Sequence, residues 1–178
     1  MRVVTDEASD RLSENVGFRR SFEAFYASEL KAVVGLAYVL SGSRAGAEDL
    51  AQEGFLAAYR EWDRISGYDD AGAWVRRVVA NRAVSGFRRA RVETRALIRL
   101  ASDRHVVPEF PAESEELWQE VRRLPTRQKQ TIALRYLDRR SIADIARILE
   151  CSENTAKTHL KRAQRTLSKR LGYTEEDL

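Results

Sequence analysis

The sequence predicts an all-α protein in which two small helical domains are joined by a flexible linker. Apolar residues recur at three- and four-residue steps along most of the 178-residue chain, which is the period of an amphipathic helix. We find no run of alternating polarity of the kind that half-buried strands show. Two of the three prolines, Pro108 and Pro111, lie in one short stretch through which a helix rarely continues. The expected segments are an arm (1–17), a first domain (18–100), the linker (101–113), a second domain (114–172) and an acidic tail (173–178).

The first domain is expected to hold three helices. A helical pattern begins at Phe18 and ends near Gly42, and Ser43 is placed to cap the next helix. That helix carries an apolar stripe from Ala47 to Trp62, with acidic and amide side chains away from it. A third helical stretch covers about residues 71–100.

The second domain is expected to end in a helix-turn-helix. Apolar residues mark one helix before Pro125 and another after it, and Ser141 is the expected N-cap of a short third helix. Only three residues, 150–152, separate that helix from a longer basic one. A short helix, a tight turn and a basic helix form the arrangement that many proteins use to read the major groove of DNA.

The last helix divides into two faces when its residues are placed at about 100° per residue. Its apolar residues fall within an arc of about 60° and can pack on the preceding helices. A separate arc of about 140° holds Asn154, Lys157, Thr158, Lys161, Arg162 and Arg165. Cations can hold phosphates while shorter polar groups read base edges, so this face suits DNA. An ordinary amphipathic surface helix is the alternative interpretation.

Charge is distributed in blocks that the net value of +4 conceals. Residues 6–70 carry a net −6, residues 76–104 a net +7, residues 109–120 a net −5 and residues 121–170 a net +10. The cations are mostly arginine, 26 against 5 lysines, and guanidinium suits phosphates and base edges. Two basic segments on structured elements therefore favour two contacts with a nucleic acid over solvated helix surface.

Several classes of protein are excluded or disfavoured. A single cysteine, Cys151, rules out a disulfide framework or a cysteine-rich zinc site, and no cofactor is implied. The longest uncharged run has 12 residues, the N-terminus lacks the apolar core of a signal peptide, and we expect a cytoplasmic protein without a membrane anchor. Its two histidines lie far apart, and no phosphate loop or nucleophile elbow is present, so an enzyme is not expected.

Three stretches together resemble the RNA polymerase sigma factors of the extracytoplasmic function (ECF) subfamily, which carry only conserved regions 2 and 4. AEDLAQEGFLAAYREWDRI (47–65) is similar to region 2.2, and AWVRRVVANRAVSGFRR (73–89) to regions 2.3 and 2.4. LPTRQKQTIALRYLDRRSIADIARILECSENTAKTHLKRAQRTL (124–167) is similar to region 4. The order and spacing of the three make the resemblance specific.

The resemblance implies three partners: core RNA polymerase, contacted through the β′ coiled coil and the β flap, promoter DNA, and an anti-sigma factor. It places the β′ contact on the region 2.2 helix, at residues expected to be exposed: Asp49, Leu50, Gln52, Glu53 and Phe55. Carboxylates and an amide beside apolar groups suit a basic coiled coil. An acidic solvated face is the alternative.

Region 2.3/2.4 of the family captures and reads the unwound −10 element of the promoter. The matching base-reading residue is Asn81, which shares a helix face with Arg77 and Arg88. The loop 66–72 would form part of a pocket for a flipped base. Backbone contacts are expected from Arg76, Arg82 and Arg89, and Trp74 is either a core residue or a stacking platform.

Region 4 of the family reads the −35 element as duplex. The resemblance carries this role to Lys157, Thr158, Lys161 and Arg162, with His159 at the margin and Asn154, Thr155 and Arg165 beside them. The turn often has Gly where this chain has Glu150, and a positive φ there would cost Glu on the order of 1 kcal/mol. A helix-turn-helix regulator that is not a polymerase subunit is the alternative function.

Overall fold

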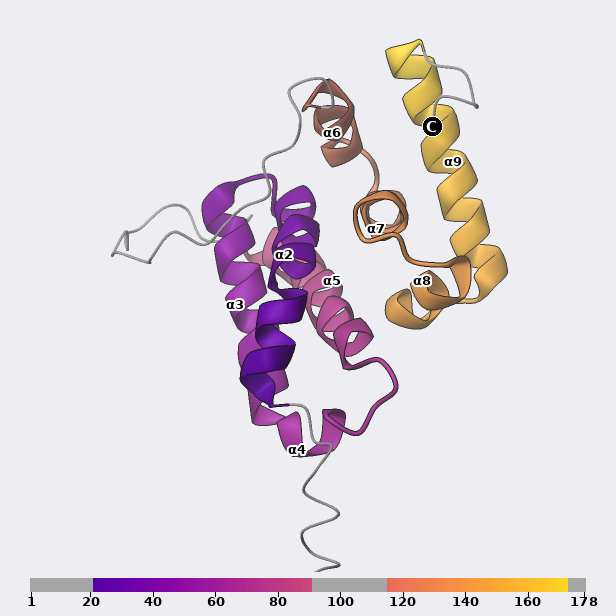
Figure 1. The fold of residues 1–178 in the computed structure, drawn as a ribbon. Coiled ribbons are helices and arrows are strands. Elements are labelled where there is room, and N and C mark those ends of the chain that lie inside the picture. Colours follow the sequence, from indigo (N-terminus) through magenta and orange to yellow (C-terminus); the bar gives the residue numbers. More distant parts are fainter. Residues whose placement is uncertain (1–20, 91–114, 173–178) are drawn as a thin grey trace, which may run out of the picture.

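The computed structural model describes residues 21–90 and 115–172, and in this part of the chain every regular element is a helix. The predicted arm, linker and tail lie outside the described residues, as do the side chains of residues 85–90. The N-terminal unit consists of α2 (Phe22–Ser41), α3 (Arg44–Arg60), α4 (Trp62–Ile65) and α5 (Ala71–Ala90). The C-terminal unit consists of α6 (Glu115–Arg122), α7 (Thr126–Ile132), η2 (Ala133–Leu137), α8 (Ile142–Leu149) and α9 (Glu153–Leu171). Figure 1 shows the two units side by side, with α9 at the outer edge of the molecule.

The predicted boundary between α2 and α3 is confirmed. Gly42 adopts a left-handed conformation (φ 78°) and its N–H bonds to the carbonyl of Tyr38, which closes α2. Ser43 then accepts a hydrogen bond from the Gly46 N–H at 3.1 Å and so caps α3. The two helices are thereby held as an antiparallel pair.

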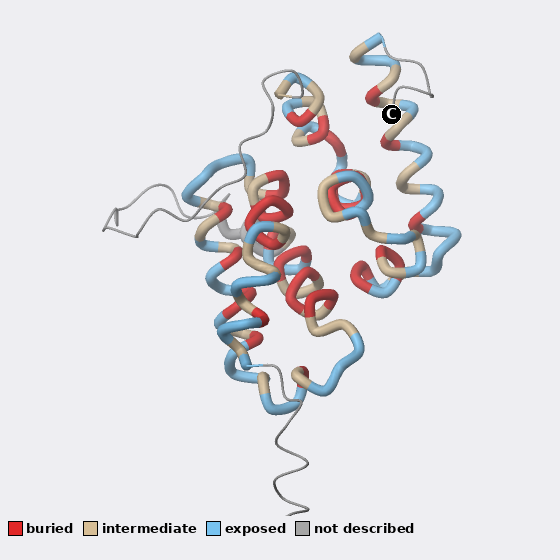
Figure 2. The backbone as a smooth tube through the Cα atoms, viewed as in Figure 1, coloured by how far each residue is buried: buried red, intermediate tan, exposed pale blue. Residues whose placement is uncertain are grey.

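α2 is the central helix of the core. By length and composition it is apolar enough to cross a membrane, but residues such as Val33, Leu36 and Ala37 are at most 1% exposed within the protein. The apolar residues of α3 and α5 are buried in the same way against α2, and the opposite face of α3 is exposed (Figure 2). The high hydropathy of α2 is therefore that of a buried core helix.

Gly54 allows α3 to pack closely against α5. A Cβ at this position would lie 2.7 Å from Cγ2 of Val79 and 3.4 Å from Cγ1 of Val75. Both valines are fully buried, so they have no solvent-filled space into which to move. The glycine thus sets the distance between the two helices that carry the candidate functional residues of the N-terminal unit.

The predicted helix-turn-helix is also confirmed, together with the predicted cap at Ser141. Ser141 and Asp144 form a capping box at the start of α8, and Ser152 caps α9 by accepting from the Thr155 N–H at 3.1 Å. Glu150 ends α8 with φ 54° and ψ 50°, so the turn does require a left-handed residue where the family often has Gly. The fold accommodates the cost expected for Glu.

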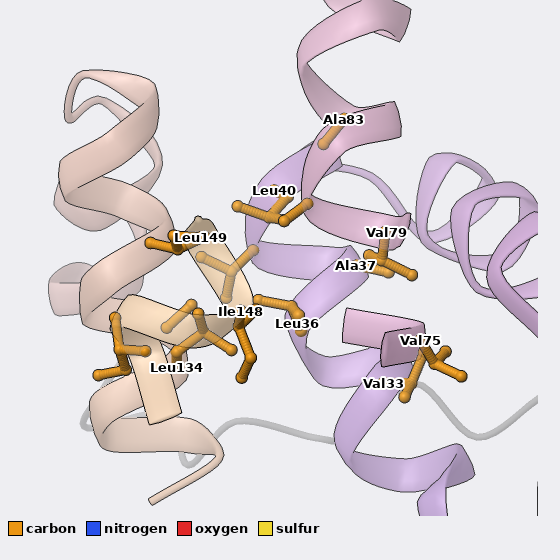
Figure 3. Packing of buried hydrophobic residues seen from close by; sticks show 14 of the residues in the cluster. Val33, Leu36, Ala37, Leu40, Val75, Val79, Ala83, Leu134, Ile148 and Leu149 are labelled. Carbon is orange, nitrogen blue, oxygen red and sulfur yellow. The ribbon is translucent and has the colours of Figure 1, made fainter. Parts of the chain in front are cut away.

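The two units share one apolar core, which the sequence did not predict. Figure 3 shows Leu36 and Leu40 of α2 facing Leu134, Ile148 and Leu149 of the C-terminal unit. Each of these side chains is at most 3% exposed. The units are consequently packed against one another in the described structure, although each has its own helical arrangement.

Candidate nucleic-acid and polymerase interfaces

One face of α9 is an exposed polar surface. The apolar arc predicted for this helix is confirmed, because Ala156, Ala163 and Leu167 are at most 1% exposed and seat the helix on the C-terminal unit. The opposite side chains are exposed: Asn154, Thr155, Lys157, Thr158, Lys161, Arg162 and Arg165. Cations and short polar groups therefore lie together on one open face, which is the combination that a major-groove helix uses.

His159 differs from its neighbours on α9. It is half-buried, and its Nδ1 is buried without a hydrogen-bond partner among the described residues. Burial, together with the positive charges of Arg127 and Arg162, lowers the pKa of the imidazole. The side chain is therefore neutral at neutral pH, and its position at the margin of the polar face agrees with the sequence expectation.

A cleft of about 370 Å³ lies where the loop after α4 meets α5. Tyr68 and Trp74 line it with apolar ring surface, Arg77 contributes a cation, and Arg147 of α8 reaches it from the C-terminal unit. Trp74 is half-buried: it packs on the core, and it also lines the cleft. The predicted loop and helix thus do form a pocket.

The remaining predicted −10 residues occupy different environments along α5. Asn81 and Arg82 are exposed one turn beyond Arg77, whereas the side chain of Arg88 lies outside the described part. Arg82 donates to Glu53 of α3 at 2.5 Å, although both side chains are about half exposed, so the pair adds little stability. Arg82 can therefore exchange Glu53 for another anion.

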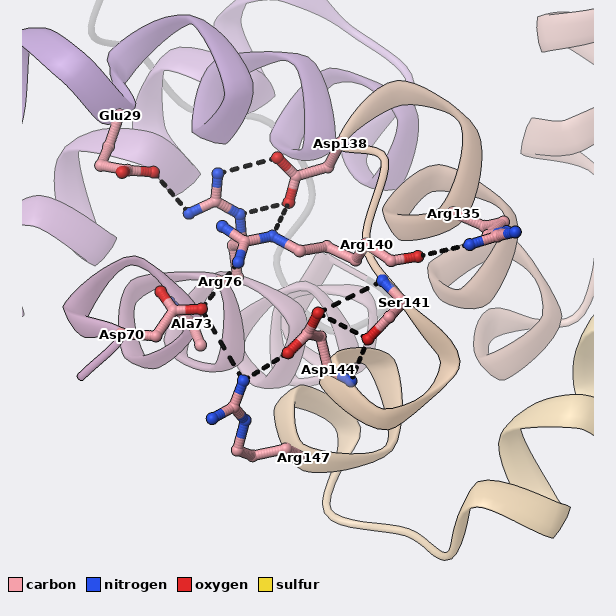
Figure 4. Close-up of polar contacts among 10 residues, drawn as sticks. All are labelled: Glu29, Asp70, Ala73, Arg76, Arg135, Asp138, Arg140, Ser141, Asp144 and Arg147. Carbon is pink, nitrogen blue, oxygen red and sulfur yellow. Dashed lines mark hydrogen bonds and ion pairs between the residues drawn. The ribbon is translucent and has the colours of Figure 1, made fainter. Parts of the chain in front are cut away.

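Arg76 is buried, with a side chain only 2% exposed. It donates to both carboxylate oxygens of Asp138, at 2.8 Å from Nη2 to Oδ1, and to Glu29 at 2.7 Å from Nη1 (Figure 4). Burial opposes the charge, but the hydrogen bonds to Asp138 and Glu29 raise the pKa of Arg76 above its ordinary value. In this conformation Arg76 does not reach the surface, where the sequence expected a DNA contact.

The predicted polymerase-docking residues of α3 are only partly exposed. Asp49, Gln52 and Glu53 are exposed and Leu50 is half-buried. Phe55 was expected to be exposed, and this is wrong: it is 4% exposed because its ring packs edge-on against those of Phe25 and Tyr26.

Two exposed apolar side chains on α3 were missed by the sequence interpretation. Leu56 is 49% exposed and Tyr59 is 62% exposed, and both line an apolar groove of about 260 Å³ between α2 and α3. Leu56 follows Gln52 by one helical turn and so shares its face, which is the signal that could have identified it. Exposed apolar groups beside carboxylates are typical of a protein-binding surface.

No three metal-ligating side chains come together within residues 21–90 and 115–172. The chemistry that the described surface can perform is recognition: a cationic helix face, an aromatic-lined cleft and an acidic-apolar groove.

Comparison with known proteins identifies the family to which the chain belongs. The family description "Sigma-70 region 2" matches residues 25–93, and "Sigma-70, region 4" matches residues 114–167. The ECF RNA polymerase sigma factor BldN of Streptomyces coelicolor is 31% identical over 186 residues, an alignment that covers 96% of this chain and 69% of BldN. SigM of Mycobacterium tuberculosis is 29% identical, with 88% of this chain and 80% of SigM covered.

A solved structure agrees with the fold. The sigma factor RpoE, crystallised with the anti-sigma factor NepR from Bartonella quintana, superimposes with a TM-score of 0.68 at 22% identity. The superposition covers 85% of this chain and 96% of that one. Two family descriptions match this chain, and the alignment with BldN covers nearly the whole of it. The chain therefore belongs to the ECF subfamily of RNA polymerase sigma factors.

Proposed function

We propose that this sigma factor docks on core polymerase through the surface of α2 and α3, reads the −10 element with α5 and reads the −35 element with α9. The observation that carries the proposal is the exposed face of α9, which presents four cations with Asn and Thr side chains on a capped helix seated by its apolar arc. A helix of this kind can enter the major groove with its N-terminal half against the base edges.

The −10 assignment rests on the cleft beside α5. Its aromatic rings, Tyr68 and Trp74, offer surface on which an unstacked base can lie, and Asn81 is exposed one turn beyond Arg77 on the same helix. An amide can pair with a base edge, while guanidinium groups hold the phosphates of a single strand. We therefore assign base reading to Asn81.

The docking assignment rests on the groove of α2 and α3. Leu56 and Tyr59 supply exposed apolar surface, and Asp49 and Glu53 supply negative charge at its side. A basic coiled coil with apolar residues in its seam complements this surface. Leu56→Asp should abolish binding to core polymerase without unfolding the chain, because half of the side chain is already in water.

Transcription initiated by core polymerase tests the DNA assignments. Asn81→Ala should retain core binding in a pull-down and fail to open the −10 region in a permanganate footprint. Lys157→Ala should weaken binding to promoters with a −35 element, whereas Lys169→Ala, which removes the same charge three turns further along α9, should not. If Asn81→Ala lost core binding as well as −10 opening, Asn81 would have a structural role. Specific duplex binding without polymerase would favour an ordinary regulator.

An anti-sigma factor is part of the proposal. The RpoE chain that shares this fold was crystallised with the anti-sigma factor NepR. The same apolar groove of α2 and α3 offers such a protein a site that competes with polymerase. Affinity purification of the chain from its host would identify the anti-sigma factor as a protein that co-purifies in the absence of polymerase.

A further inference from the structure

A histidine and two arginines come together where α7 packs against α9. His159 is half-buried, and its Nδ1 is enclosed without a hydrogen-bond partner among the described residues. Arg162 lies three residues further along α9, on the same side of the helix. Arg127 belongs to α7, and the positive charges of both arginines act on the imidazole. We call these three residues the α7–α9 cation site.

The helix-turn-helix holds Arg127 in position. Its Nη1 donates to the backbone carbonyl of Leu149, the last residue of α8, at 3.2 Å, and lies 3.4 Å from Oε1 of Gln130. A cation at this place also interacts favourably with the C-terminal end of the α8 dipole. The side chain is nonetheless exposed and forms no ion pair with another described residue. Its other N–H groups are therefore available to an anion from outside the protein.

Within the described residues, no carboxylate offsets the positive charge at His159. Burial is the largest cause of its lowered pKa, and the charges that add to it are those of Arg127 and Arg162. The other cation of α7, Lys129, is buried, and its own pKa is lowered by burial and by Arg122 of α6. Carboxylates of the surrounding elements pair with other cations: Glu115 with Arg122, Glu120 with Arg170, Asp138 with Arg76, Asp144 with Arg147, Glu150 with Arg77 and Glu153 with Lys157.

A phosphodiester between the two arginines would reverse the charge around His159. In the free chain both cations oppose protonation of the imidazole, whereas a phosphate supplies the opposite charge and an acceptor for an imidazole N–H. Guanidinium groups bind phosphate oxygens with geometry that favours such a contact. Backbone phosphates flank the major groove, so a helix lying in the groove brings its margin, where His159 stands, close to one of them.

We propose that the α7–α9 cation site binds one backbone phosphate of the −35 duplex, and that His159 takes up a proton when the phosphate binds. This inference rests on the proposed function, because that function places α9 in the major groove. It adds α7 to the DNA-binding surface and makes the binding depend on pH. The phosphate raises the pKa of His159 in the complex above that in the free chain, so DNA affinity increases as the pH falls from 8 to 6.

Duplex binding by the full-length chain at low salt tests the site, because phosphate contacts do not depend on sequence. The probe is a fluorescent, random-sequence duplex of about 20 base pairs, and anisotropy reports its binding. The wild type should bind it at least about threefold more tightly at pH 6 than at pH 8. Circular dichroism at both pH values confirms that each variant retains its helices.

Two substitutions of His159 separate its charge from its shape. His159→Gln should lose the difference between pH 6 and pH 8, because glutamine does not titrate. His159→Arg carries a fixed charge and should bind equally tightly at both pH values. His105→Gln is the matched control: it makes the same change at the other histidine of the chain and should keep the pH dependence of the wild type.

Arg127→Gln tests the contribution of α7. It should weaken binding at both pH values, diminish the pH dependence, and reduce the slope of log affinity against log salt concentration by about one. Arg44→Gln is its matched control, because Arg44 is exposed on α3 and likewise forms no ion pair with a described residue.

Several results would overturn the proposal. They are equal wild-type affinity at pH 8 and pH 6, an undiminished increase in His159→Gln, an Arg127→Gln variant that binds as Arg44→Gln does, or no duplex binding at low salt. Failure of the proposed function has a different signature: duplex binding depends on pH through His159, but neither the wild type nor any variant supports promoter-dependent transcription with core polymerase.

Discussion

Replacing Gly54 by alanine tests the packing of α3 on α5, because two effects of opposite sign meet at this residue. Alanine in a helix interior is favoured over glycine by about 1 kcal/mol, which on its own would stabilise α3. The added methyl group, however, would lie 2.7 Å from Cγ2 of Val79, about 0.7 Å closer than the 3.4 Å at which ordinary contact begins. The net effect depends on whether Val79 can move.

Val79 cannot move cheaply. It is fully buried, its branched side chain has one strongly preferred rotamer in a helix, and Val75 already stands 3.4 Å from the same methyl position. Relief therefore requires α3 and α5 to separate, and overpacking of this kind costs about 1–3 kcal/mol. We expect Gly54→Ala to lower the free energy of unfolding by about 1 kcal/mol after the helix gain is subtracted.

Urea unfolding followed by circular dichroism measures this difference, and a double-mutant cycle isolates its cause. In a Val79→Ala background the methyl group has space, so Gly54→Ala should there stabilise the chain by about the helix-propensity difference, ~1 kcal/mol. An increase in stability of the same size in the wild-type background would refute the reasoning, because it would show that the contact between the helices does not resist the methyl group.

Three further changes probe the buried ion pair of Arg76 with Asp138, the helix-turn-helix and His159. Arg76→Met should lower the free energy of unfolding by about 3 kcal/mol in urea, because it removes the buried partner of Asp138. Ser141→Ala should cost about 1 kcal/mol through the lost cap. Hydrogen bonds from Ser141 lower the pKa of Asp144, so this deficit should be present at neutral pH and shrink below the ordinary carboxyl value of 3.8. Burial and nearby arginines lower the pKa of His159, so the free energy of unfolding should fall as the pH drops through 6.5. In His159→Gln this decrease should be absent when unfolding is compared at pH 7.5 and 5.5.

The helix boundaries were predictable because local chemistry determines them. Gly42, Ser43, Ser141 and Ser152 act as caps within three or four residues of the groups they satisfy, and no distant partner is needed. The exposed face of α9 was predictable for a related reason: a single apolar arc fixes how the helix is rotated against its own unit.

The rotation of a helix about its own axis is harder to predict from sequence where apolar residues lie on more than one side. On α3, Phe55 and Leu56 are neighbours some 100° apart, and the sequence does not show which one faces the core. The structure buries Phe55 among the aromatic rings of α2 and leaves Leu56 half exposed in the groove. Which residues form the proposed docking surface therefore depends on packing between helices.

The environment of Arg76 could not be predicted because its partner is distant in the sequence. Asp138 lies 62 residues further along the chain, in the other unit. The position does border an apolar stripe, since Val75 precedes it directly and Val79 follows three residues later, and both are fully buried. That pattern indicates a boundary position, but a charged residue at such a boundary is usually solvated.

Transcription with the core polymerase of the same host, on fragments of its genome, tests the central claim most directly. We expect promoter-dependent transcripts only when this chain is added, and we expect Asn81→Ala to lose them although that variant still binds the polymerase. Absence of any promoter-dependent product on every genomic template would contradict the account, as would undiminished transcription by Asn81→Ala.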